Sequence, residues 1–233
     1  MRVVVVGASV LGLSAAYHAA RAGASVVVVD QAHDGRASAA GAGIICPWVP
    51  GADDPDRYRL AAAGARYYPQ LVEMLAQCGE RQISYKQVGA LLVSSDAAEL
   101  DWMEREVRSL RAAEPAAGNI ARLTPREARE LFPPLRADLA AVRLGGGARV
   151  DGRLLCAALS RAAAKHGAEM RQGAAELLVG GTRARGIRLD DEALDADAVI
   201  VAAGAWAPGI LGPIGVRLAV EPERGQIVHL HPP

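Results

Sequence analysis

This 233-residue chain has no net charge, because 26 lysine and arginine residues balance 26 aspartate and glutamate residues. A neutral balance gives no reason to expect nucleic acid or an anionic membrane as a partner. Cysteine is also scarce: Cys46, Cys78 and Cys156 are odd in number and widely separated, and no C-x-x-C pair occurs. A disulfide framework and a zinc site are therefore not expected, and a reducing cytoplasm fits best.

Long apolar runs are missing as well. The first one, in MRVVVVGAS, breaks at Gly7 and is too short for a signal peptide, and no stretch approaches the length of a membrane span. The chain also contains no G-x-S-x-G, no H-E-x-x-H and no Walker-type glycine–lysine loop. We therefore expect a cytoplasmic protein without an integral membrane segment, and the sequence identifies no catalytic residue.

The remaining composition is typical of an α/β protein. Hydrophobic residues make up 51% of the chain and charged residues 22%. This length can bury a sizeable core as one large domain or as two small ones.

The first thirty residues carry the most informative pattern. The valines at 3–6 predict a buried parallel strand, and Gly7, Ser9 and Gly12 follow where a helix begins. A second valine run at 26–29 ends in Asp30, about 20 residues after the glycine turn. Such a turn places a pyrophosphate on the helix N-terminus, and the acid accepts hydrogen bonds from a ribose. The pattern favours a dinucleotide cofactor over an ordinary βαβ unit, although Ser9 replaces the middle glycine of G-x-G-x-x-G.

The rest of the chain predicts alternating helices and strands. Helices are expected at 10–22, at 57–78 with a break or kink at Pro69, after Asp96 with Glu99 completing a capping box, after Thr124 with Glu127, and after Asp151. Strands are expected at 83–93 around Gly89, at 139–144, in a meander over 175–191, at 198–203 and at 225–230.

Several single residues have two interpretations. The small residues at 38–45 predict a packed segment against something flat rather than a flexible linker. Trp48 could line a substrate site or fill the core. His229 and His231 would share one strand face, and a solvated strand is favoured over a metal site, so no metal is expected.

Taken together, these segments resemble the FAD-dependent D-amino-acid oxidase-like family, which includes glycine oxidase, sarcosine oxidase and D-amino-acid dehydrogenase. The resemblance rests on VVVVGASVLGLSAAYHAARAGASVVVVDQ, SAAGAGIICPW, VGALLVS, ARVDGRLLCAALSRAAAKHGAEM, VIVAAGAWAP and EPERGQIVHL, in that order. It implies FAD as the cofactor, with the following contacting residues: Gly7, Ala8, Ser9, Val10, Leu11, Gly12, Asp30, Gln31, Ser38, Ala39, Ala40, Gly41, Ala42, Gly43, Ile44, Ala175, Ala203, Gly204 and Trp206.

The resemblance also implies an α/β fold in which a Rossmann-like FAD-binding domain with a parallel sheet is interleaved with an α+β substrate domain of mixed sheet. The FAD-binding domain would comprise 1–80 and 143–217, and the substrate domain 81–142 and 218–233. The implied activity is oxidation of a small amine or D-amino acid to an imine by hydride transfer to flavin. A flavoprotein acting on a 2-hydroxy acid or glycerol phosphate is an alternative.

Family members continue well past EPERGQIVHL. We therefore expect the chain to be a fragment or truncated form, or to be completed by another chain. A non-catalytic FAD-fold fragment is a further alternative, and an incomplete sheet would favour self-association.

Overall fold

The computed structural model describes residues 1–51 and 54–223, and these form two compact units. The first unit contains Met1–Ala42, Met74–Ile83 and the described residues from Asp151 onward. The second contains Gly43–Glu73 and Ser84–Val150.

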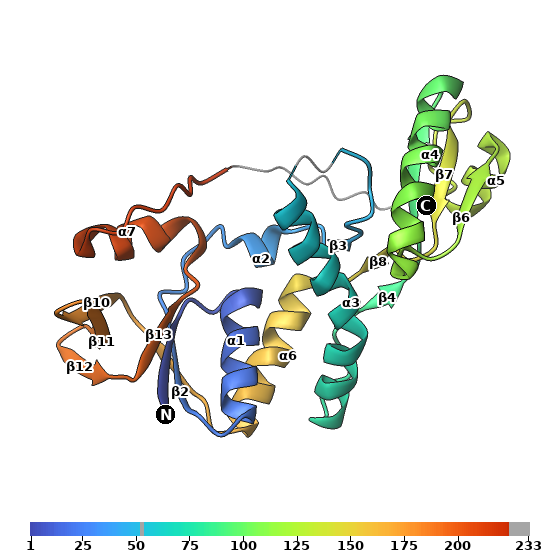
Figure 1. Ribbon diagram of the computed structural model, residues 1–233. Coiled ribbons are helices and arrows are strands. Elements are labelled where there is room, and N and C mark those ends of the chain that lie inside the picture. Colours follow the sequence, from blue (N-terminus) through green and yellow to red (C-terminus); the bar gives the residue numbers. More distant parts are fainter. Residues whose placement is uncertain (52–53, 224–233) are drawn as a thin grey trace. The chain divides into compact units, whose positions relative to one another are not determined.

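A parallel sheet forms the centre of the first unit, in the order β13-β1-β2-β9 (Figure 1). Its strands are β1 (Arg2–Val6), β2 (Ser25–Asp30), β9 (Glu169–Gln172) and β13 (Ala198–Val201). The valines of β1 and β2 are almost completely buried, as expected for strands covered on both faces. The valine runs therefore predicted the two central strands correctly.

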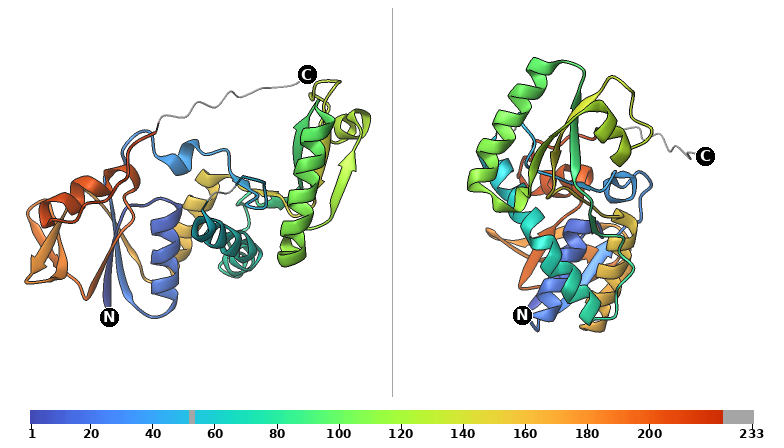
Figure 2. Two further views of the ribbon diagram at one scale, coloured as in Figure 1. Left: turned by 45° about the horizontal axis from the view of Figure 1, so that its top comes forward. Right: turned by 90° about the vertical axis from the view of Figure 1, so that its right-hand side faces the viewer.

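Helices cover one face of this sheet and a second, antiparallel sheet covers the other. Helices α1 (Val10–Arg21) and α6 (Gly152–Lys165) pack side by side in Figures 1 and 2. The meander consists of β10 (Ala175–Gly180), β11 (Arg183–Leu189) and β12 (Glu192–Asp195). Alternate residues of β1 and β2, among them Val4 and Val29, pack against Ile187 and Leu194 of the meander. Two short helices complete the unit, α2 (Ala37–Ala40) and α7 (Ala207–Leu211).

The second unit is built on a three-stranded antiparallel sheet in the order β5-β7-β6. These strands are β5 (Ala90–Ser94), β6 (Ile120–Leu123) and β7 (Ala140–Leu144), with α4 (Ala97–Ala113) packed against them and α5 (Pro125–Leu131) following β6. A smaller sheet joins β3 (Ile44–Ile45), β8 (Ala148–Arg149) and β4 (Lys86–Gln87). Leu100 and Val107 of α4 bury themselves against Val142 and Leu144 of β7.

Local signals predicted the helix starts well. Asp96, Thr124 and Asp151 each accept a backbone N–H at the start of α4, α5 and α6, respectively. The capping box at Asp96 is wrong, because Ser94 Oγ accepts the Asp96 N–H and donates to Glu99 Oε2 instead.

Of the two alternatives expected at Pro69, the division into two helices is wrong, and a kink within one helix stays a prediction. Helix α3 runs without interruption from Pro55 to Gln77, with Pro69 inside it. Pro69 itself is exposed, and because it has no N–H it cannot donate the helical hydrogen bond to the carbonyl of Ala65, a buried residue.

Five strands of the described residues were not predicted. The strands β3, β6, β9 and β12 lie at sheet edges and β8 has two residues, so each leaves little apolar pattern in the sequence. The expected strand at 225–230, together with Arg224, His229 and His231, lies outside the described residues. The assignment of one unit to the cofactor and the other to the substrate stays a prediction, and so do the domain bounds. Residues 43–73 were expected in the cofactor domain, and they lie in the second compact unit.

Candidate functional site

The tight turn between β1 and α1 requires glycine at two positions. Gly7 has φ of +111°, and a Cβ there would lie 2.4 Å from the Ala202 carbonyl oxygen. A Cβ on Gly12 would lie 1.9 Å from the Gly7 carbonyl oxygen. Between them, Ser9 is the N-cap residue of α1, and its carbonyl accepts the first intrahelical hydrogen bond from Leu13. The N–H groups at the start of α1 are therefore free of helical partners and point toward the turn.

Asp30 lies at the end of β2, directly beside this turn. Its Oδ2 accepts the Ala8 N–H at 2.7 Å and its Oδ1 accepts the Ala32 N–H at 2.7 Å. The Arg36 guanidinium lies 3.5 Å from Oδ1. The acid that the sequence singled out is therefore held rigidly next to the glycine turn, with its carboxylate partly accessible.

The segment after Asp30 returns over the N-terminus of α1. Ser38 Oγ accepts the Val10 N–H at 3.2 Å, and Gly152 allows the Ser38 carbonyl to approach α6 closely. The pKa of the Cys156 thiol on α6 is raised by burial, and this effect exceeds the lowering by a hydrogen bond with Ser38 and by the positive charge of Arg36. Ser38 and Arg36 therefore both lie near Cys156.

The small-residue loop is less packed than expected. Ser38 and Gly43 are half-buried, but Ala39 to Ala42 are exposed, and the Ile44 side chain is 75% exposed. Position 43 requires glycine, because its φ is +68° and a Cβ there would lie 1.8 Å from the Val150 carbonyl oxygen. Gly43 and Ile44 belong to the second unit, so the loop divides between the two units.

A pocket of about 250 Å³ opens at the carboxyl ends of β1 and β2, the edge at which parallel sheets bind ligands. Six of the residues predicted to contact a cofactor line it, together with others of the same unit. The lining comprises Val6, Gly7, Val29, Asp30, Gln31, His33, Gly173, Ala175, Ala203, Trp206, Gly209 and Ile210.

His33 is a pocket residue that sequence reasoning missed. Its ring stacks on Trp206, with centroids 4.9 Å apart and planes 11° from parallel, and its Nε2 lies 2.5 Å from Gln31 Oε1. A single histidine in a polar loop carries no sequence signal, and only its position two residues after Gln31 connects it with the acid at the strand end. The chain fold brings it onto Trp206.

Trp48 lies elsewhere. It is 3% exposed in the core of the second unit, and its indole N–H has no hydrogen-bond partner within the described residues. Its packing agrees with the core alternative, and a role toward substrate stays a prediction. Leu11, expected at the turn, has a side chain that is 70% exposed.

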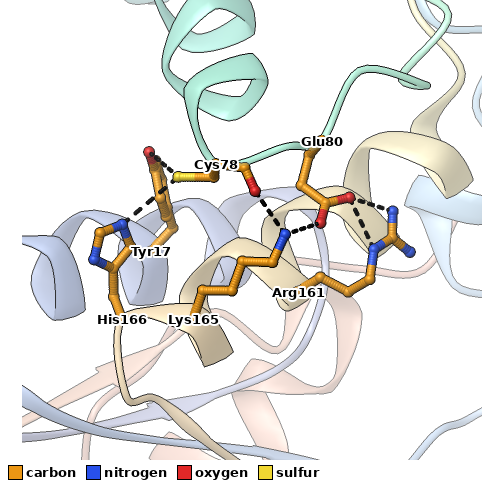
Figure 3. A network of polar contacts seen from close by, with 6 residues as sticks. All are labelled: Tyr17, Cys78, Glu80, Arg161, Lys165 and His166. Carbon is orange, nitrogen blue, oxygen red and sulfur yellow. Dashed lines mark hydrogen bonds and ion pairs between the residues drawn. The ribbon is translucent and has the colours of Figure 1, made fainter.

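A separate polar network surrounds Glu80, in the loop after α3 (Figure 3). Glu80, only 7% exposed, accepts two hydrogen bonds from Arg161 and one from Lys165, and these bonds hold its pKa below the ordinary range. Lys165 also donates to the Cys78 carbonyl at 2.6 Å, and the Cys78 sulfur lies 3.7 Å from both Tyr17 Oη and His166 Nε2. These contacts tie the loop after α3 to α6 and α1.

Among residues 1–51 and 54–223, no three histidine, cysteine, aspartate or glutamate side chains gather as metal ligands. No helix in the same part of the chain is long and apolar enough to cross a membrane.

Comparison with known proteins agrees with this geometry. A family profile described as "FAD dependent oxidoreductase" matches residues 2–233. The chain is 44% identical to the uncharacterized oxidoreductase YurR of Bacillus subtilis (strain 168) and 32% identical to glycine oxidase of Pseudomonas putida KT2440, covering 97% of this chain and 61% of the relative in both cases.

A solved structure, iminodiacetate oxidase from Chelativorans sp. BNC1, matches with a TM-score of 0.89 and 48% identity over 93% of this chain and 58% of that one. The chain thus spans about three fifths of the length of the proteins it matches.

Proposed function

The chain belongs to the family of FAD dependent oxidoreductases, and from this premise we propose that it binds FAD in the first unit and serves the oxidation of a small amine or amino acid. FAD is the cofactor of that family. The observation that carries the proposal is the convergence of the glycine turn, the Asp30 carboxylate and the pocket at the carboxyl ends of β1 and β2.

The residues present fit the adenosine diphosphate half of FAD. The close approaches at Gly7 and Gly12 leave a cradle without side chains, and the N–H groups at the start of α1 can donate to phosphate oxygens. The Asp30 carboxylate can accept from ribose hydroxyls, as in dinucleotide-binding βαβ units. Ala175 and Ala203 offer small walls on which an adenine ring can lie.

The same proposal includes the other predicted contacts of the first unit, which are Ala8, Ser9, Val10, Leu11, Gln31, Ser38, Ala39, Ala40, Gly41, Ala42, Gly204 and Trp206. The contacts predicted at Gly43 and Ile44 fall in the second unit and stay predictions.

FAD, when bound, would supply an isoalloxazine ring as hydride acceptor, so that an amine losing a hydride from carbon and a proton from nitrogen becomes an imine. The work of the protein in such a reaction is to orient the substrate and to exclude water. The relatives named above favour a particular substrate class. Glycine and iminodiacetate share an amine nitrogen attached to a CH2–carboxylate group, and we propose a substrate with this unit. A 2-hydroxy acid or glycerol phosphate is the less favoured alternative.

Flavin content and reduction test this proposal. The chain is purified and its flavin absorbance measured; it is then mixed anaerobically with glycine or iminodiacetate, and separately with lactate or glycerol 3-phosphate. Bleaching of the flavin by the amines alone is the expected result. Bleaching by the hydroxy compounds alone would favour the alternative function, the oxidation of a 2-hydroxy acid or glycerol phosphate. Stoichiometric flavin without bleaching by either class would identify a cofactor-binding protein without oxidase activity. Absence of flavin, with no uptake of added FAD, would contradict the proposal.

A cytoplasmic location and self-association are also proposals. The three cysteines are free thiols, which supports a reducing compartment. Sedimentation velocity of the purified chain would show whether it associates.

A further inference from the structure

Arg36 is the cation that the fold places beside the glycine turn. Its Nη1 lies 3.5 Å from Asp30 Oδ1, too far for a good hydrogen bond, and its side chain is 43% exposed. Among the residues that the structure describes, Asp30 is the carboxylate with which it pairs. The pairing is loose, so most of the five donors of the guanidinium are available to another anion.

The main chain holds Arg36 in this position. Its carbonyl accepts the Ala39 N–H at 3.0 Å as α2 begins, and two residues later Ser38 Oγ accepts the Val10 N–H at the start of α1. The arginine therefore follows the ribose-binding acid and precedes the hydroxyl on the helix N-terminus. A group lying between Asp30 and the first turn of α1 is within reach of its guanidinium.

The charges expected at this site favour a contact between Arg36 and a phosphate group. A pyrophosphate carries two negative charges, and Asp30 adds a third close by. The N-terminus of α1 offers about half a positive charge, which leaves the site with a strong negative excess. A single positive charge would be enough to neutralise Asp30. The planar guanidinium of Arg36 can in addition donate two parallel hydrogen bonds, and two phosphate oxygens match that geometry.

We propose that Arg36 is a pyrophosphate-binding residue, which exchanges its loose pairing with Asp30 for phosphate oxygens when the cofactor binds. The proposal rests on the proposed function, since it assumes that a dinucleotide occupies this site. It separates two roles: Asp30 holds the ribose, and Arg36 holds the phosphates.

Binding of ADP and adenosine to the 233-residue chain distinguishes these roles, measured by isothermal titration calorimetry at low salt. In Arg36→Gln, the dissociation constant for ADP should rise about tenfold, the loss of one charge-assisted contact, while that for adenosine changes less than twofold. Arg36→Lys should fall between, because it keeps the charge and loses the fork. High salt should reduce the difference between the wild-type chain and Arg36→Gln.

Arg188→Gln is the matched control. Arg188 lies on β11 and makes a similarly loose ion pair, 3.6 Å from Glu176. Its substitution should change neither dissociation constant.

Three results would count against the proposal. Unchanged ADP binding in Arg36→Gln overturns it. An equal loss for ADP and adenosine also overturns it, because Arg36 would then act by positioning Asp30. Failure of the wild-type chain to bind either ligand overturns the cofactor site itself, and with it the arginine contact.

Discussion

The polar network around Glu80 allows a stability prediction with a worked magnitude. Removing one partner of a fully buried ion pair costs about 3–5 kcal/mol, whereas an exposed pair contributes about 0–1 kcal/mol. Glu80 is buried, with 8% of its side chain exposed, but Arg161 and Lys165 are 57% and 51% exposed. In Glu80→Gln the two cations can regain water, so we expect a loss of about 2 kcal/mol, between the two limits.

Thermal unfolding followed by circular dichroism measures this loss. For a chain of this length, about 2 kcal/mol corresponds to a Tm lower by roughly 4–8 °C at pH 7. Glu106→Gln is the control, because Glu106 is an exposed glutamate on α4 without an ion pair in the described part of the chain. Its free energy of unfolding should stay within about 0.5 kcal/mol of the wild-type value, a change in Tm of about 1–2 °C at most.

The pH dependence of the difference provides a second check. Arg161 and Lys165 lower the pKa of folded Glu80 below its ordinary value of 4.5. A lowered folded pKa means that the stabilisation is fully present above the unfolded pKa and is lost as the pH falls through the folded one. The Tm difference between wild type and Glu80→Gln should therefore be constant from pH 7 to about 5 and shrink below the ordinary value. A difference absent at pH 7, or unchanged in acid, would refute the reasoning.

Two further predictions concern the cofactor site. Asp30→Ala should weaken FAD binding by about 1.5–3 kcal/mol, since a charge-assisted hydrogen bond to the ribose is lost; FAD fluorescence titration measures this, and wild-type affinity in the variant would exclude the role. Gly12→Val should abolish FAD binding and also lower the Tm, because a Cβ 1.9 Å from the Gly7 carbonyl oxygen forces the turn to move. The variant should keep its far-ultraviolet circular dichroism at low temperature, and full flavin occupancy after purification would contradict the fingerprint interpretation.

Structural features that depend on residues close together in the sequence could be predicted from the sequence alone. The valine runs of β1 and β2, the turn at Gly7 and Gly12, and the N-caps at Thr124 and Asp151 depend on residues within a few positions of one another. Their signals are local: the strand propensity of consecutive β-branched residues, the positive φ that glycine allows at Gly7, and side-chain acceptors for unpaired N–H groups. The family resemblance rested on the same segments, and the family profile confirms it.

The tertiary structure alone decided which distant segments meet. The pocket joins residues from the ends of β1 and β2 with Gly173, Ala175 and the segment from Ala203 to Ile210, and no short-range pattern specifies that meeting. His33 lines the pocket and stacks on Trp206, a residue far away in the sequence. Arg36 and Glu80 are ordinary charged residues in the sequence, and their partners lie 6 to 85 positions away. Burial and charge pairing act through space, so a linear pattern cannot determine them.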